Sequence, residues 1–196
     1  NTTKDTLHNA MQQKEVVINV VNYAITQQVN LSSAEYSSDV DEFVKSGLTP
    51  IDSDVVAPRR VKESPVSLEC EVRDVLHMGE EGGAGNLVMC VVKKMHIADD
   101  VLSDNGGIDQ DAIDLVGRLG KAWWVRASGD ALFELAPPKL GIGVDQIPDV
   151  IRRSTILTGN NLGQLGSEIT LPTAEEVEGK KNDFDVRRIL QNFADG

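Results

Sequence analysis

The chain has 196 residues, 40% of them hydrophobic, which is enough for one sizeable core and too few to argue for two. Its 19 Lys and Arg stand against 31 Asp and Glu, and the net charge of −12 disfavours nucleic acid as a partner because it would repel a phosphate backbone. No apolar run approaches the roughly 20 residues that span a bilayer and no leader opens the chain, so we expect a cytoplasmic protein without a membrane partner.

The first ten residues, NTTKDTLHNA, predict the start of a helix, because Leu7, Ala10 and Met11 follow a helical spacing. Two interpretations are open. The segment is either an ordinary capped helix start or a phosphate cradle, in which backbone N–H groups, hydroxyls and the Lys4 ammonium would bind an anion. Asp5 opposes a phosphate unless it accepts a hydrogen bond from a ligand hydroxyl, such as one on the ribityl chain of a flavin.

The next elements are predicted to be mostly strands. Residues 15–24 are rich in β-branched side chains and apolar on both faces, which predicts a central strand. Residues 27–65 form a long, partly helical connection. From Val66 apolar and polar residues alternate, with Ser67 and Glu69 on the polar side, which predicts a half-buried strand. The glycine-rich segment 79–86 then turns into a second strand, so the two strands form a hairpin.

The second half of the chain is predicted to be less regular. An Asn-Gly-Gly turn at 105–107 precedes a short helix that places Ile113, Leu115, Val116 and Leu119 toward the core, and residues 121–135 are extended. The Gly/Pro-rich segment 136–173 holds a short helix near 150–153, and the charged segment 174–196 includes an amphipathic pattern over 184–193. This order predicts a mainly β protein with peripheral helices, built on a closed or partly closed antiparallel sheet.

Side chains with catalytic or metal-binding chemistry do not form a recognisable motif. Cys70 and Cys90 lie in apolar runs, which indicates buried thiols in a reducing compartment. The three histidines, His8, His77 and His96, lack the spacing of metal ligands, so no metal site is expected. A dinucleotide fingerprint fails at Gln146, and Ser128 has no recognisable histidine partner. We therefore predict no catalytic side chain.

Several segments in order resemble the flavin reductase-like family, whose domains are FMN-binding split β-barrels of Greek-key antiparallel topology. They are NTTKDTLHN, VVINVVNYAITQQVNLSS, VKESPVSLECEV, EGGAGNLVMCVV and IDLVGRLGKAWWVRASGD. The subgroup is the one related to flavoredoxin and to the reductase components of two-component monooxygenases. The resemblance implies one such domain over 1–173, followed by a charged, partly helical tail over 174–196. Family members have strands before the phosphate segment, so here these strands are missing or the barrel is completed differently.

The resemblance also implies a function. FMN would be the cofactor, with Thr2, Thr3, Lys4, Asp5, Thr6, Asn19 and Arg118 as its contacts, and Trp123 or Trp124 would lie in the core or cover the ring. NADH or NADPH would supply a hydride, and electrons would pass to an acceptor such as a partner monooxygenase. A homodimer is implied as well. Two alternatives are an FMN-carrying electron-transfer protein without its own NAD(P)H site and a cofactor-free interaction module.

Overall fold

A computed structural model describes residues 5–79, 84–138 and 140–180. The chain divides into two compact units, Asn1–Phe133 and Glu134–Gly196, and each is described by itself. Across the described ranges no helix is long and apolar enough to cross a bilayer. The domain boundary at residue 173 stays a prediction, and the amphipathic pattern over 184–193 lies outside the described residues.

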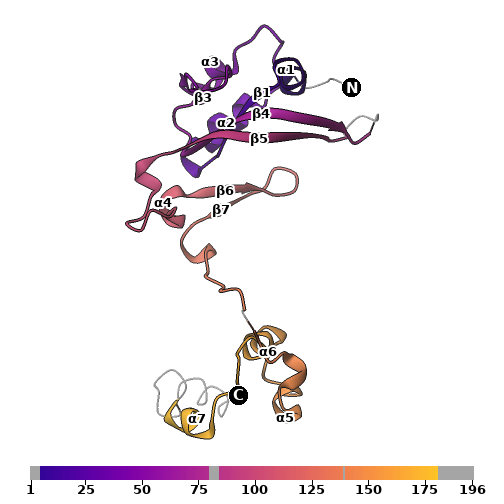
Figure 1. Ribbon diagram of the computed structural model, residues 1–196, viewed down its shortest axis with the longest axis vertical. Helices are drawn as coiled ribbons and strands as arrows, with labels where there is room; N and C mark the ends of the chain where they lie inside the picture. Colours follow the sequence, from indigo (N-terminus) through magenta and orange to yellow (C-terminus); the bar gives the residue numbers. More distant parts are fainter. Residues whose placement is uncertain (1–4, 80–83, 139, 181–196) are drawn as a thin grey trace. The chain divides into compact units, whose positions relative to one another are not determined.

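The first unit is built on an antiparallel sheet in the order β1-β4-β5. Strands β4 (Val66–His77) and β5 (Asn86–Ile97) form the predicted hairpin and run side by side as the two longest strands (Figure 1). Their register shifts between Glu69 and Cys70 and again between Val72 and Asp74. Such irregularities bend a strand and increase its local twist, so β4 and β5 are expected to bend at these two points.

The strand predicted over 15–24 is shorter than expected and does not lie in the centre of the sheet. β1 (Glu15–Asn19) pairs only with β4 among the described strands, and the chain then turns through η1 (Tyr23–Ile25) into α2 (Thr26–Ser32). The apolar residues of β1 are explained by α1 (Asp5–Gln13), which packs against β1 and β4. The predicted first helix is confirmed, with Leu7 and Ala10 buried.

The polar side of β4 was predicted to face solvent, and this is wrong at the start of the strand. Ser67 is 3% exposed and Glu69 is fully buried. The connection covers them: β2 (Pro50–Ile51) pairs with β3 (Arg60–Val61), and the loop between these strands reaches Glu69. Cys70 is buried as expected, whereas Cys90 on β5 is only half-buried.

The helix predicted through Leu119 ends much earlier. Only α4 (Gln110–Ile113) is helical, and Asp114, in the left-handed region at φ 48°, ends it. The chain continues as β6 (Leu115–Arg118), which pairs with β7 (Trp124–Ala127). The remaining helices of this unit are α3 (Glu42–Ser46), η2 (Asp99–Val101) and η3 (Gly129–Ala131). A core of Val66, Val101 and Ile113 joins β4 to η2 and α4, with Leu115 of β6 packed against it.

The second unit is helical in its described part. Its elements are η4 (Val144–Gln146), α5 (Asp149–Arg152), α6 (Gly159–Gly166) and α7 (Ala174–Lys180). The short helix near 150–153 was predicted, whereas α6 was not. α6 begins with a reciprocal cap, in which the Thr158 hydroxyl accepts from the backbone N–H of Asn161 and the Asn161 side chain accepts from the N–H of Thr158.

Candidate functional site

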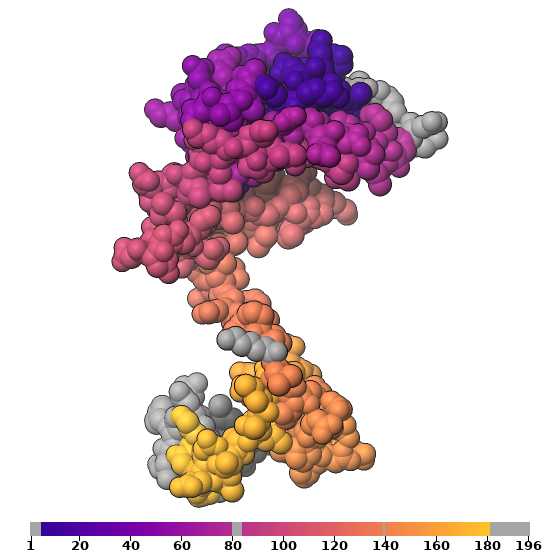
Figure 2. All heavy atoms as spheres, in the orientation of Figure 1, coloured from indigo at the N-terminus to yellow at the C-terminus, as the bar shows by residue number. Residues whose placement is uncertain are grey.

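One cavity of the first unit lies between α1, β1 and the connection over 32–61. We call it the α1 cavity; its volume is about 680 Å³. Figure 2 shows α1, coloured indigo, at the surface beside the purple connection. Asp5, Thr6 and Asn19, three of the residues predicted from the resemblance, all line this cavity. Thr2, Thr3 and Lys4 lie outside the described residues.

The lining of the α1 cavity mixes hydrogen-bond donors with carboxylates. Besides Thr6 it contains Ser32, Ser38 and the exposed Arg59, and Arg59 makes no ion pair or hydrogen bond within the described ranges. Sequence reasoning missed these residues: Ser32 ends α2, and Ser38 and Arg59 lie in an irregular connection. The signal that was available is the basic cluster RRVK at 59–62 in a strongly acidic chain.

The carboxylates of the α1 cavity are partly occupied by the protein itself. Four of them line it: Asp5, Glu15, Asp41 and Glu42. Glu15 accepts a hydrogen bond of 2.7 Å from the backbone N–H of Ala57, and Asp41 caps α3 by accepting from the N–H of Phe43 at 2.9 Å. These two carboxylates therefore connect the walls of the cavity, whereas Asp5 and Glu42 form no ion pair or side-chain hydrogen bond with any residue that the structure describes.

Asn19 has a structural role at the floor of the α1 cavity. Its Oδ1 accepts from the backbone N–H of Val61 at 3.1 Å and from the Ser67 hydroxyl at 2.9 Å, which ties β1 to β3 and β4. An amide oxygen has two lone pairs, so these bonds use its acceptor capacity. The side-chain NH₂ group remains as the donor that Asn19 offers to a ligand.

Arg118 lies in a different place from the other predicted site residues. It lines a second cavity of about 530 Å³, the β6–β7 pocket, which shares no lining residue with the α1 cavity. Trp124, half-buried, also lines this pocket, whereas Trp123 is 73% exposed. The structure thus brings Asp5, Thr6 and Asn19 together and sets Arg118 apart from them.

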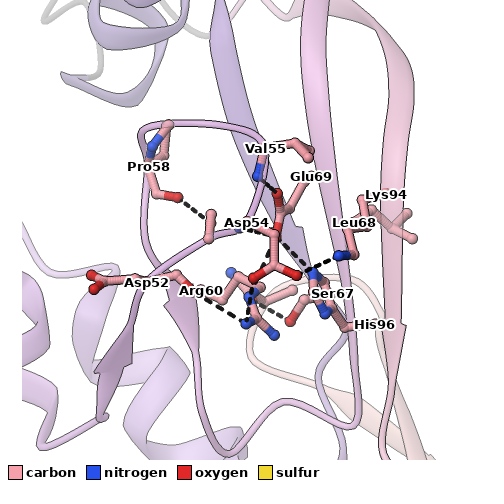
Figure 3. Close-up of polar contacts among 12 residues, drawn as sticks. Asp52, Asp54, Val55, Pro58, Arg60, Ser67, Leu68, Glu69, Lys94 and His96 are labelled. Carbon is pink, nitrogen blue, oxygen red and sulfur yellow. Dashed lines mark hydrogen bonds and ion pairs between the residues drawn. The ribbon is translucent and has the colours of Figure 1, made fainter.

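A network of ion pairs and hydrogen bonds surrounds Glu69, whose side chain is fully buried. Its carboxylate accepts from the backbone N–H groups of Asp54 at 2.9 Å and Val55 at 2.7 Å. His96 Nε2 lies 2.6 Å from the same carboxylate, and Arg60 Nε lies at 3.5 Å. Figure 3 shows Glu69 reaching from β4 toward the loop that carries Asp54 and Val55. An ionised carboxylate only accepts hydrogen bonds, so His96 Nε2 carries the hydrogen.

The charge of Glu69 is stabilised by its partners. Burial alone raises the pKa of its carboxyl, but the hydrogen bonds from the Asp54 and Val55 N–H groups and from His96 outweigh burial, and the pKa lies below its ordinary value. Asp54, Glu69 and His96 offer ligand atoms within 4.8 Å of one another, a grouping that their sequence spacing did not reveal. Arg60 and Lys94 form ion pairs with these carboxylates, which reduces the negative charge that the cluster offers to a cation.

The lowered pKa of Glu69 predicts that the protein is sensitive to acid. The ordinary value is 4.5, and the folded value lies below it, so the stabilisation is fully present above pH 4.5 and is lost as the pH falls through the folded pKa. We expect the free energy of unfolding, measured by urea titration at a series of pH values, to decrease over this acid range. The same curve should be flatter for Glu69→Gln. An equally steep curve for the variant would assign the acid sensitivity to other carboxylates.

Comparisons with known proteins found a matching family model and related sequences. A family model described as "Flavin reductase like domain" matches residues 1–111. An uncharacterized protein from Aquifex aeolicus is 30% identical over 130 residues, which cover 66% of this chain and 64% of that protein. One from Halalkalibacterium halodurans is 37% identical over 120 residues, or 60% of this chain and 57% of that protein. The chain therefore spans less than two thirds of the length of either relative.

Three solved structures illustrate the fold that this chain shares. Nitrilotriacetate monooxygenase component B from Bacillus cereus is 25% identical with a TM-score of 0.62, covering 68% of this chain and 65% of its own. A protein with a split barrel domain from Shewanella frigidimarina is 29% identical with a TM-score of 0.59 and the same two coverages, 68% and 65%. Flavoredoxin of Desulfovibrio vulgaris, at 18% identity, TM-score 0.57 and coverages of 68% and 69%, shares the fold. The predicted split-barrel class is confirmed, and the described strands form an open part of such a barrel.

Proposed function

Since the chain belongs to the flavin reductase-like domain family, we propose that it binds FMN, takes a hydride from NADH or NADPH and passes electrons to an acceptor. Family membership supports the flavin. That the flavin is FMN, that the donor is NADH or NADPH and that the electrons pass to an acceptor are the parts that we propose. The similarity to nitrilotriacetate monooxygenase component B supports a partner monooxygenase as the acceptor. The proposal also includes a homodimer in the cytoplasm and the division into a domain over 1–173 and a tail over 174–196.

The α1 cavity has the donors that FMN would need. Its volume of about 680 Å³ lies within the usual range for small-molecule sites, about 300–1,000 Å³. Arg59, which has no carboxylate partner among the described residues, and the Thr6 hydroxyl at the first turn of α1 suit a phosphate dianion. This unpartnered arginine in the cavity wall is the observation that carries the proposal.

The remaining walls suit the other parts of the cofactor. Asn9 and the NH₂ group of Asn19 would hydrogen-bond to a chain of hydroxyls, and Asp5 would accept from a ribityl hydroxyl instead of opposing the phosphate. Val17 and Phe43 supply apolar surface for a ring. In this assignment the side chains bind, orient and exclude water, while the bound flavin supplies the hydride-accepting chemistry. No acid or base is required from the chain, in agreement with the absence of a predicted catalytic side chain.

The direct test is the absorbance spectrum of the purified chain with added FMN, before and after NADH or NADPH. We expect a yellow protein whose flavin absorbance is bleached by one of the two donors. A yellow protein that neither donor bleaches would support the electron-carrier alternative, in which the chain has no nicotinamide site. A chain that stays colourless with FMN would overturn the proposal in favour of a cofactor-free module.

The assignment of the phosphate to Arg59 and Thr6 is tested by substitution. We expect Arg59→Ala to weaken FMN binding by about ten-fold or more and Thr6→Ala by a smaller factor, because a charged hydrogen bond contributes more than a neutral one. Flavin fluorescence quenching measures both affinities. The control is Arg153→Ala, an exposed arginine of the second unit that pairs with Asp149. FMN affinity unchanged by Arg59→Ala would remove the phosphate from this cavity.

A further inference from the structure

The β6–β7 pocket concentrates positive charge in an acidic protein. Arg118, Lys121 and Arg126 line it, and none of its described lining residues is Asp or Glu, although the chain has 31 acidic and 19 basic residues. A recess lined with charges of one sign raises the local concentration of ligands of the opposite sign. The pocket is therefore suited to an anion.

The register of the β6–β7 hairpin places the charged and aromatic groups on one face. Arg118 lies opposite Trp124, and Val116 lies opposite Arg126. Directly opposed residues share a face of an antiparallel pair, and so do alternate residues of one strand, so all four side chains lie on the same face. The Arg118 guanidinium lies 5.2 Å from the Trp124 ring centroid, and that of Arg126 lies 4.0 Å from the Tyr23 ring. Tyr23 and Trp124 thus supply aromatic surface to the pocket, each with an arginine guanidinium over its ring.

Two of the three cations are available to a ligand. Arg126 is bound by Asp114 through two hydrogen bonds, Nε to Oδ1 at 2.7 Å and Nη2 to Oδ2 at 2.8 Å, so its charge is balanced. Arg118 and Lys121 have no carboxylate within 4.0 Å in the part of the chain that the structure describes, and Arg118 donates one bond of 3.2 Å to the backbone carbonyl of Lys121. The pocket therefore offers two uncompensated positive charges.

The backbone at Lys121 is a second indication of a ligand. Lys121 has φ 57°, in the left-handed region where a residue with a Cβ atom is disfavoured and glycine is the usual choice. The neighbouring Gly120 does not take this conformation. A disfavoured backbone conformation at a charged residue that lines a pocket is typical of functional positions.

We propose that the β6–β7 pocket binds the ADP-ribose part of the nicotinamide dinucleotide, with Arg118 and Lys121 on its phosphates and Trp124 and Tyr23 beside the adenine ring. This inference rests on the proposed function, in which NADH or NADPH delivers the hydride. Two free cations match the charge of a pyrophosphate, and the aromatic groups match a planar base. Arg118 is then a contact of the nicotinamide donor rather than of FMN.

The test is calorimetric titration of the FMN-loaded chain with ADP-ribose, which carries no hydride, so that binding is measured apart from reduction. We expect Arg118→Ala and Lys121→Gly to weaken ADP-ribose by about ten-fold or more while the FMN affinity stays unchanged. Inorganic phosphate, the second probe, should bind far more weakly than ADP-ribose, since it lacks the base and the second phosphate.

Lys14→Gly is the matched control, because Lys14 is also left-handed, at φ 61°, and lines neither cavity. Both glycine variants should unfold at higher temperature than the wild type, and only Lys121→Gly should lose ADP-ribose affinity. The proposal is overturned if the wild type does not bind ADP-ribose, if neither pocket variant weakens it, or if Arg118→Ala weakens FMN instead. Failure of the proposed function is read separately, as a chain that takes up no flavin colour.

Discussion

Replacing Glu69 with alanine is expected to reduce the free energy of unfolding by about 4 kcal/mol, the largest effect of any single substitution considered for the first unit. The side chain is fully buried, and its removal takes from His96 its carboxylate partner and leaves Arg60 with only the longer contact to Asp54, at 3.9 Å. The backbone N–H groups of Asp54 and Val55 lose their acceptor as well. A buried donor without an acceptor keeps its full desolvation cost.

Urea titration followed by tryptophan fluorescence measures this loss, because both tryptophans, Trp123 and Trp124, belong to the first unit. Glu71→Ala is the control, two positions along the same strand. Its side chain is 60% exposed and pairs with Lys93 at 3.2 Å on the surface, so its loss should cost less than about 1 kcal/mol. Equal effects of the two substitutions would show that the buried network contributes no more than a surface ion pair.

Gly141→Ala is expected to destabilise the second unit by about 3 kcal/mol, at the upper end of what overpacking costs. A Cβ atom at this position would lie 2.3 Å from the carbonyl oxygen of Gly166 and 3.0 Å from Cα of Ser167. Both are backbone atoms, so a change of side-chain rotamer cannot relieve the overlap with the added Cβ atom. The same contact is held by hydrogen bonds of 2.9 Å from Ile142 N to Glu168 O and from Gly143 N to Gly166 O.

Hydrogen exchange of the Ile142 and Gly143 amides, followed by nuclear magnetic resonance, reports on this contact, and Gly141→Ala should make both amides exchange faster. Gly163→Ala is the matched control within α6, since a Cβ atom there meets nothing within 4 Å. It should stabilise the helix by about 0.5–1 kcal/mol, because alanine loses less conformational entropy than glycine. If both amides of the Gly141→Ala variant exchange as slowly as in the wild type, the close contact at Gly141 does not contribute to the stability of the second unit.

Local patterns were sufficient for the elements that depend on neighbours in sequence. The alternation from Val66 and the glycine-rich segment after it predicted the β4–β5 hairpin, and the spacing of Leu7 and Ala10 predicted α1. The place of β1 at an edge of the sheet could not be predicted, because its apolar side is covered by α1, which is a tertiary contact. Likewise the burial of Glu69 depends on a loop 14 and 15 residues earlier in the chain.

Residues of the candidate site could be predicted from the sequence only where they belong to segments that resemble the family. Asp5, Thr6 and Asn19 belong to segments with a family resemblance, and the structure places all three on one cavity. Arg59 and Ser38 lie in a connection without periodicity, and only the fold brings them to the same wall. Arg118 was expected beside the others, yet the hairpin register aims it into a pocket with Lys121 and Trp124. The register of the strands decides which cavity a side chain lines, and the register cannot be derived from composition.

Strand β5 has a consequence for how the protein behaves in concentrated solution. Among the described strands it pairs only with β4, and these apolar side chains along it are exposed: Leu87, Met89, Val91, Val92, Met95 and Ile97. Unpaired backbone groups beside exposed apolar side chains form a template for strand addition between molecules, which leads to aggregation. Lys93 and Lys94 interrupt the run, and charges in such positions act as gatekeepers. Both lysines also form ion pairs, Lys93 with Glu71 and Lys94 with Asp54, so salt that screens these pairs and the net negative charge should favour precipitation along this edge.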